Sequence, residues 1–133
     1  MKSILVLLSI MYCAVQCKTL DPVVIDEWEK GVLPHIDYCV STTNVDWDIA
    51  KNMFRHVHLP DESTFHCYMK CIFDRMSFLN SDQELDQDQM LQHIYALTPD
   101  LSQLCVDESA GIEDICVKMY NITKCIVHDI ADD

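Results

Sequence analysis

Cysteine is the residue type whose number and spacing indicate chemistry most directly in this sequence. The chain has eight cysteines in 133 residues. Two of them, Cys13 and Cys17, lie in an apolar amino-terminal segment that reads as a secretory signal peptide and would be removed from the mature protein. An even number of cysteines in a small secreted chain is typical of disulfide bonds. The remaining six therefore predict three disulfides among Cys39, Cys67, Cys71, Cys105, Cys116 and Cys125.

Helical geometry restricts how these six cysteines can pair. Cys67 and Cys71 are four residues apart on a predicted helix, so both side chains point the same way and each must reach a different element. Cys116 and Cys125 are nine residues apart, about half a turn out of phase, so the last predicted helix should be bonded to two different neighbours. These constraints leave the individual pairs open.

One segment has a residue order that could do catalysis. Cys125 to Asp129 reads Cys-x-x-His-Asp, an order also found on the catalytic helix of secreted phospholipases. That chemistry needs a histidine that activates water and a glycine-rich loop that binds calcium. The chain has only two glycines and no cysteine doublet, and no Ser or Cys nucleophile lies beside an obvious base. Chance explains the match better, and we expect no enzymatic activity.

Three histidines could indicate a zinc site instead. His56 and His58 are separated by one residue, and His66 precedes Cys67. In an oxidising compartment the cysteines are bridged rather than free to bind zinc. Isolated histidines are more often ordinary surface or core residues than metal ligands. We therefore expect no metal and no cofactor.

The first 17 residues read as a secretory signal peptide. Lys2 supplies a positive charge, residues 4–11 are apolar apart from Ser9, and Val15 and Cys17 stand three residues and one residue before a predicted cut. A membrane anchor is the alternative, but the apolar run is too short to span a bilayer. A lipoprotein box ending at Cys17 is disfavoured by the bulky Gln16. We expect a signal peptide at 1–17, and a single extracellular domain at 18–133 that is not inserted in a membrane.

Composition and charge exclude several other classes. The net charge of −13 makes nucleic acid a poor partner, because phosphates repel an acidic chain. Two glycines and four prolines are few for a sandwich or barrel of many short strands. Acidic runs such as residues 82–88 are most simply a solvated surface.

Apolar residues recur at helical spacing along most of the remaining chain, apart from the polar and irregular stretch 77–86, so the predicted class is all-α with about six helices. Asp21 and Pro22 form a typical helix start, and Gly31 and Pro34 should bend or break the first helix. The last helix carries the longest apolar stripe. The predicted ranges after the first helix are 46–54, 61–76, 86–97, 98–105 and 112–130.

The spacing Cys39-x27-Cys67-x3-Cys71-x33-Cys105-x10-Cys116-x8-Cys125 resembles that of insect odorant-binding proteins of the six-cysteine type. The segment from Cys67 to Phe73 resembles that family's central helix. The resemblance implies the pairs Cys39–Cys71, Cys67–Cys116 and Cys105–Cys125, and six helices around an apolar cavity. The stretch between Leu97 and Cys105 is short, which predicts an abbreviated fifth helix. The eight residues after Cys125 resemble the tails of short-tailed members.

The resemblance implies a secreted, non-enzymatic carrier that binds small hydrophobic odorants or pheromones and delivers them to olfactory receptors. The same carrier could instead bind a lipid or hormone-like ligand in a non-olfactory secretion, which tissue expression would decide. A secreted helical enzyme or signalling ligand is a third hypothesis, weakened by the missing catalytic set. The sequence leaves ligand identity and homodimer formation open.

The apolar stripes give a predicted cavity lining, although from the sequence alone methionines such as Met69 and Met119 are by default ordinary core. The resemblance favours a cavity, because flexible Met side chains suit varied apolar ligands. Tyr68 or Tyr95 could offer a hydroxyl to an oxygenated ligand, or could equally be a core tyrosine whose hydroxyl is already bonded. The predicted ligand-binding residues are Trp28, Val32, Ile36, Phe65, Tyr68, Met69, Ile72, Met76, Met90, Ile94, Leu97, Ile115, Met119, Ile122 and Ile126.

Two expectations concern the carboxyl-terminal third of the chain. Ile126, Val127 and Ile130 could lie across the pocket mouth. Protonation of His93 or His128, together with loss of carboxylate hydrogen bonds in the tail, predicts ligand release at low pH. Asn121-Ile122-Thr123 is a glycosylation sequon. Asn121 lies opposite the apolar stripe, where it should be reachable, but also close to the face of Cys125, which a neighbouring helix could cover, so we expect it to be unmodified.

Overall fold

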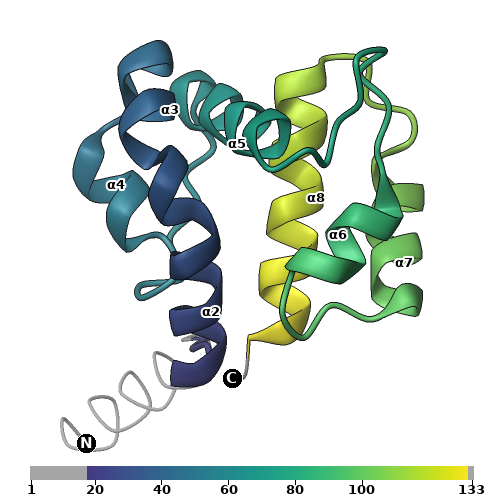
Figure 1. Cartoon of the computed structure of the whole chain (residues 1–133), viewed down its shortest axis with the longest axis horizontal. Coiled ribbons are helices and arrows are strands. Elements are labelled where there is room, and N and C mark those ends of the chain that lie inside the picture. Colours follow the sequence, from purple (N-terminus) through teal and green to yellow (C-terminus); the bar gives the residue numbers. More distant parts are fainter. Residues whose placement is uncertain (1–17, 132–133) are drawn as a thin grey trace, which may run out of the picture.

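The computed structural model describes residues 18–131, which form an assembly of helices (Figure 1). Counting α2, η1 and α3 as one interrupted helix gives six helices in this part of the chain, so the predicted all-α class is confirmed. The signal peptide predicted at 1–17 lies outside the described residues, and the domain boundaries stay a prediction. The elements are α2 (Pro22–Val32), η1 (Leu33–His35), α3 (Ile36–Thr43), α4 (Trp47–Asn52), α5 (Ser63–Arg75), α6 (Gln87–His93), α7 (Pro99–Ser109) and α8 (Ile115–Ile130).

The start of the first helix follows from its sequence. The Asp21 carboxylate accepts a hydrogen bond from the Val23 amide at 2.9 Å, and Pro22 occupies the first helical position. Pro34, which has no amide hydrogen to donate, lies in the tighter 3₁₀ turn of η1, and α3 then continues from Ile36. The expected break in the first helix is thus present.

Three helix boundaries differ from the predicted ones by more than two residues. α8 begins at Ile115 rather than Ile112, because the Asp114 carboxylate accepts from the amides of Cys116 and Val117 and caps the helix there. α6 ends at His93, so Ile94 and Leu97 lie beyond it. α7 continues four residues past Cys105 to Ser109, and the fifth helix is therefore not abbreviated.

α5 and α8 form the centre of the fold. α5 packs against α8 and α3, while α7 packs against α8. In Figure 1, α2 and α4 lie on the left, α6 and α7 lie on the right, and α8 runs between the two sides with α5 crossing above. No helix in residues 18–131 is both long and apolar enough to cross a bilayer.

Three disulfides link the central helices. They join Cys39 to Cys71, Cys67 to Cys116, and Cys105 to Cys125, which are the three pairs that the family resemblance implies. They therefore connect α3 to α5, α5 to α8, and α7 to α8. Each such bridge typically contributes about 2–4 kcal/mol. None of these three bridges reaches α2 or α6.

Candidate functional site

An apolar cavity of about 60 Å³ lies between α2, α5, α6 and α8. α5 and α8 contribute the middle and carboxyl-terminal parts of their buried faces. Phe54, which follows α4, and Phe78, which follows α5, complete the wall. The lining residues are Glu27, Trp28, Gly31, Val32, Phe54, Met69, Ile72, Phe73, Met76, Phe78, His93, Ile94, Thr123, Ile126 and Val127.

A close approach between α2 and α5 sets one side of the cavity. An ideal Cβ atom placed on Gly31 would come within 3.2 Å of the Met76 terminal methyl group. This separation is tighter than ordinary van der Waals contact. Gly31 therefore lets the end of the Met76 side chain lie against the α2 backbone at the cavity wall.

Trp28 joins α2 to two other parts of the wall. Its indole ring meets Phe54 edge-on, with ring centroids 5.2 Å apart. Its indole nitrogen donates a hydrogen bond to the main-chain carbonyl of Tyr95 at 2.8 Å. Tyr95 lies in the loop after α6, which turns sharply at Ala96 in the left-handed region with φ of 68°. The Trp28 side chain thus holds this loop beside the cavity.

Few polar groups line the cavity, and most are already bonded. The Thr123 hydroxyl donates to the Met119 carbonyl at 2.9 Å within α8. The exposed Glu27 carboxylate pairs with Lys30 at 3.2 Å. His93 is exposed at the end of α6. The interior surface of the cavity is therefore almost wholly apolar. Two of its polar lining residues, Glu27 and His93, are exposed to solvent.

Seven of the predicted ligand-binding residues lie on the cavity wall. Two belong to α2, three belong to α5 or follow it directly, one follows α6 and one belongs to α8. They come from segments far apart in the sequence, and the structure brings them together around one space. These seven residues are Trp28, Val32, Met69, Ile72, Met76, Ile94 and Ile126.

The other eight predicted residues lie away from this wall. The apolar stripes of α5 and α8 run along the whole helices, but their amino-terminal parts pack solidly on each other and on their neighbours. Seven of the eight belong to the hydrophobic core and are nearly inaccessible to solvent, while Ile115 is only half-buried. The eight are Ile36, Phe65, Tyr68, Met90, Leu97, Ile115, Met119 and Ile122.

Neither tyrosine hydroxyl is placed as the sequence suggested. Tyr68 is buried beside Phe65, with ring centroids 6.0 Å apart, and is absent from the cavity lining. Its hydroxyl has no hydrogen-bond partner among the described residues. Burial raises the pKa of the Tyr68 phenol well above its usual range. The Tyr95 side chain is exposed, and its main-chain carbonyl is the group that bonds Trp28.

Eight lining residues are not among the predicted ligand-binding residues; His93 and Val127 were expected near the cavity for other reasons, and sequence reasoning missed the other six. Phe54, Phe73 and Phe78 are aromatic, and two of them lie outside the long periodic helices, so no stripe pointed to them. Gly31 was recognised as a helix interruption, whereas the structure shows it as a contact point for Met76. Glu27 and Thr123 are polar and were not candidates for an apolar wall. The six are Glu27, Gly31, Phe54, Phe73, Phe78 and Thr123.

The carboxyl-terminal segment is part of α8 and not a separate flap. Ile126 and Val127 line the cavity as helix residues, and α8 continues through Ile130. Asp132 and Asp133 lie outside the described residues. Burial, together with the nearby ammonium groups of Lys18 and Lys124, lowers the pKa of His128. The Lys18 ammonium also donates to the His128 carbonyl at 3.0 Å.

Other candidate sites of the sequence have structural partners. Cys125 is bonded to Cys105, so the Cys-x-x-His-Asp segment belongs to a disulfide-linked helix. His66 lies 2.8 Å from the Asp61 carboxylate and packs against Tyr120. Across residues 18–131, no three His, Cys, Asp or Glu side chains are grouped to hold a metal ion. The Asn121 amide donates to the Ser109 hydroxyl at 2.9 Å, which occupies the side chain of the sequon.

Comparison with known proteins agrees with this architecture. A model of the PBP/GOBP family matches residues 24–129, a range that contains all six bridged cysteines and every cavity-lining residue. The chain therefore belongs to the PBP/GOBP family, and the resemblance drawn from the cysteine spacing is confirmed.

One curated relative is general odorant-binding protein 84a of Drosophila melanogaster. It is 31% identical over 71 residues, which are 51% of this chain and 40% of that protein. The chain thus aligns with less than half of that relative's length.

Proposed function

We propose that this protein is a secreted carrier that binds small hydrophobic odorants or pheromones in the cavity between α2, α5, α6 and α8. The observation that carries the proposal is the apolar cavity in a chain of the PBP/GOBP family. Burial of apolar ligand surface, worth about 25 cal/mol per Å², supplies the driving force. The carrier raises the concentration of its ligand in an aqueous extracellular fluid, such as the lymph of a sensory hair, and delivers it to olfactory receptors.

Ligand binding requires the cavity to expand. Pockets for small molecules usually measure about 300–1,000 Å³, whereas this cavity has about 60 Å³. Met69 and Met76 line it, and unbranched thioether side chains change rotamer at low cost. α2, α6 and the segment after α4 carry none of the three disulfides, so these parts of the wall can shift without straining a covalent cross-link.

The binding experiment uses the fluorescent apolar probe N-phenyl-1-naphthylamine and competing volatiles. We expect micromolar dissociation constants, which is what ligand-efficiency limits allow for a volatile of about 10–15 heavy atoms. Met76→Trp fills the cavity and should weaken probe binding at least tenfold. Lys51→Trp places the same ring on the exposed surface of α4 and should leave the affinity unchanged. Equal effects of both variants, with both chains folded by circular dichroism, would remove the cavity from the proposal.

Secretion and delivery need their own observations. Amino-terminal sequencing of the exported protein should begin at Lys18, as the signal peptide proposed at residues 1–17 requires. Antibody staining should find the protein in the fluid around olfactory receptor neurons. Staining confined to a non-olfactory gland would instead support the carrier of a lipid or hormone-like ligand.

A further inference from the structure

Side-chain hydrogen-bond donors in the cavity wall are already committed to main-chain carbonyls, with one exception. The Trp28 indole donates to Tyr95, and the Thr123 hydroxyl donates to Met119. The Glu27 carboxylate is an acceptor. The remaining lining residues in the described part of the chain are apolar, apart from His93. A ligand carbonyl oxygen therefore meets a free side-chain donor in this wall only at His93.

We propose that His93 is the residue that selects the polar end of the ligand. It would bind aldehydes, ketones and esters with the carbonyl oxygen at the imidazole and the apolar body among the α5 and α8 side chains. This assignment rests on the proposed carrier function. An imidazole ring nitrogen that carries a proton donates to such an oxygen, whereas the apolar interior would leave it unpaired at considerable cost.

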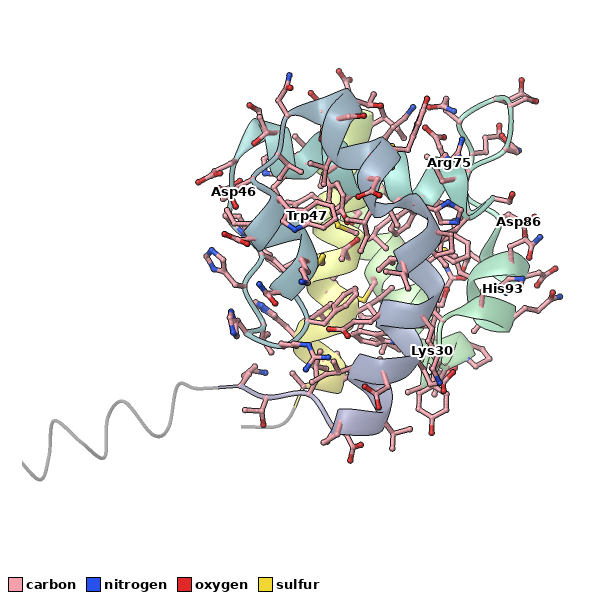
Figure 2. The ribbon with its side chains drawn as sticks, turned by 60° about the vertical axis from the view of Figure 1, so that its left-hand side comes forward. Lys30, Asp46, Trp47, Arg75, Asp86 and His93 are labelled. Carbon is pink, nitrogen blue, oxygen red and sulfur yellow. A yellow bond between two sulfur atoms is a disulfide. The ribbon has the colours of Figure 1, made fainter. Side chains whose placement is uncertain are left out.

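The position of His93 fits this orientation. It is exposed at the carboxyl-terminal end of α6, next to Ile94, which also lines the cavity. Glu27 lines the same cavity from α2 and is exposed as well. Figure 2 shows His93 on the side of the molecule away from Trp47, the first residue of α4, and its capping residue Asp46. The polar groups thus lie at the solvent edge, and the methionine and phenylalanine side chains lie inside.

The Glu27 carboxylate should interact differently with alcohols and with carbonyl compounds. An alcohol carries a hydrogen that it can donate, so the Glu27 carboxylate can receive it even without His93. A carbonyl oxygen can only accept, and the carboxylate repels it. Removal of the imidazole should therefore affect carbonyl ligands more strongly than alcohols or hydrocarbons.

The test compares displacement of N-phenyl-1-naphthylamine by octane, octanal and 1-octanol. In the wild type, octanal should bind about two- to tenfold more tightly than octane, the gain of one partly solvated hydrogen bond. His93→Phe keeps a flat ring without a donor and should abolish this ratio, while the alcohol keeps most of its advantage. His93→Gln restores an amide donor and should recover part of the ratio. His56→Phe changes an exposed histidine away from the cavity and serves as the control.

An unchanged ratio of octanal to octane in His93→Phe would overturn the assignment of His93 while leaving the carrier function standing. An equal loss of affinity for all three ligands would overturn it too, since it would make His93 a general packing residue. If the probe does not bind the wild type at all, the proposed function fails and the assignment fails with it.

Discussion

The indole nitrogen of Trp28 and the main-chain carbonyl of Tyr95 form a 2.8 Å hydrogen bond between residues 67 positions apart in the sequence. The bond joins α2 to the loop after α6, two parts of the cavity wall that the three disulfides do not link. Glu29, the residue after Trp28 in α2, forms a two-bond ion pair with Arg55 beyond α4, at 2.8 and 2.9 Å. The seam between α2 and α6 is therefore where we expect the cavity to open.

The first prediction tests this seam. Trp28→Phe keeps an aromatic ring against Phe54 but removes the donor, so we expect a loss of about 1 kcal/mol in the free energy of unfolding. Amide hydrogen exchange should become faster in the loop from Ile94 to Leu97. Trp47→Phe, on the exposed surface of α4, is the matched control. Identical exchange in the two variants would mean that the hydrogen bond does not hold the loop.

The second prediction concerns Gly31. Gly31→Ala should raise helix stability by about 0.5–1 kcal/mol, because glycine is the poorer helix former. The new methyl group would also push the Met76 side chain into the cavity and weaken binding of N-phenyl-1-naphthylamine. Gly111→Ala adds a methyl group where no atom lies within 4 Å and should leave the affinity unchanged. Tighter probe binding by Gly31→Ala would contradict the contact described for Met76.

The third prediction compares two tyrosines that both contact Phe65. Tyr120 donates its hydroxyl to the Leu59 carbonyl at 2.9 Å, whereas the Tyr68 hydroxyl is buried without a partner. Tyr120→Phe should lower the free energy of unfolding by about 1 kcal/mol. Tyr68→Phe should leave it unchanged or raise it by a similar amount, because a buried unpaired group is removed. Chemical denaturation measures both. A clear destabilisation by Tyr68→Phe would show that its hydroxyl is bonded in solution.

The fourth prediction follows from the lowered pKa of His128. In the unfolded chain a histidine has a pKa of about 6.5. Because the pKa of His128 is lower in the native state, the unfolded state binds more protons than the native state at pH values just below this. The contribution of neutral His128 to the free energy of unfolding is therefore complete above the unfolded-state pKa. It is lost as pH falls towards the native-state pKa. His128→Gln should lose less stability than the wild type between pH 8 and pH 5. The exposed His58→Gln is the control.

The same variants test whether ligand release depends on pH. Probe affinity should fall between neutral pH and pH 5 in the wild type, and less so in His128→Gln. A constant affinity over this range would exclude the release predicted from the sequence. A chain ending after Val127 that keeps the full pH dependence would place the responsible group outside the last six residues.

Helix starts could be predicted where a single side chain decides them. Asp21 before Pro22 and Thr98 before Pro99 both act as caps in the structure. The end of α6 could not be predicted, because Ile94 and Leu97 continue the apolar period past the point where the chain turns. That turn depends on a left-handed Ala96 and on a bond from Trp28, a distant residue. The apolar periodicity of a sequence predicts which face of a helix is buried, but it does not predict the residue at which the helix ends.

The cavity wall could be predicted only in part for a related reason. Met69 and Phe65 lie on the same stripe of α5, yet Met69 lines the cavity and Phe65 packs on Tyr120 with ring centroids 5.9 Å apart. The pattern of one helix cannot distinguish a filled part of its buried face from a hollow part. That difference depends on Phe54 and Phe78, which reach the wall from outside the helices with clear stripes.

The arrangement of the disulfides has a consequence for protein engineering. The bridged helices α3, α5, α7 and α8 keep their covalent links whatever side chains α2 and α6 carry. Glu27, Gly31, His93 and Ile94 border the cavity from these two unbridged helices or the residues next to them. A combinatorial library confined to such positions would vary ligand preference without altering any of the three disulfides. The chain is thus a suitable scaffold for a set of biosensors that differ in binding specificity and share one framework.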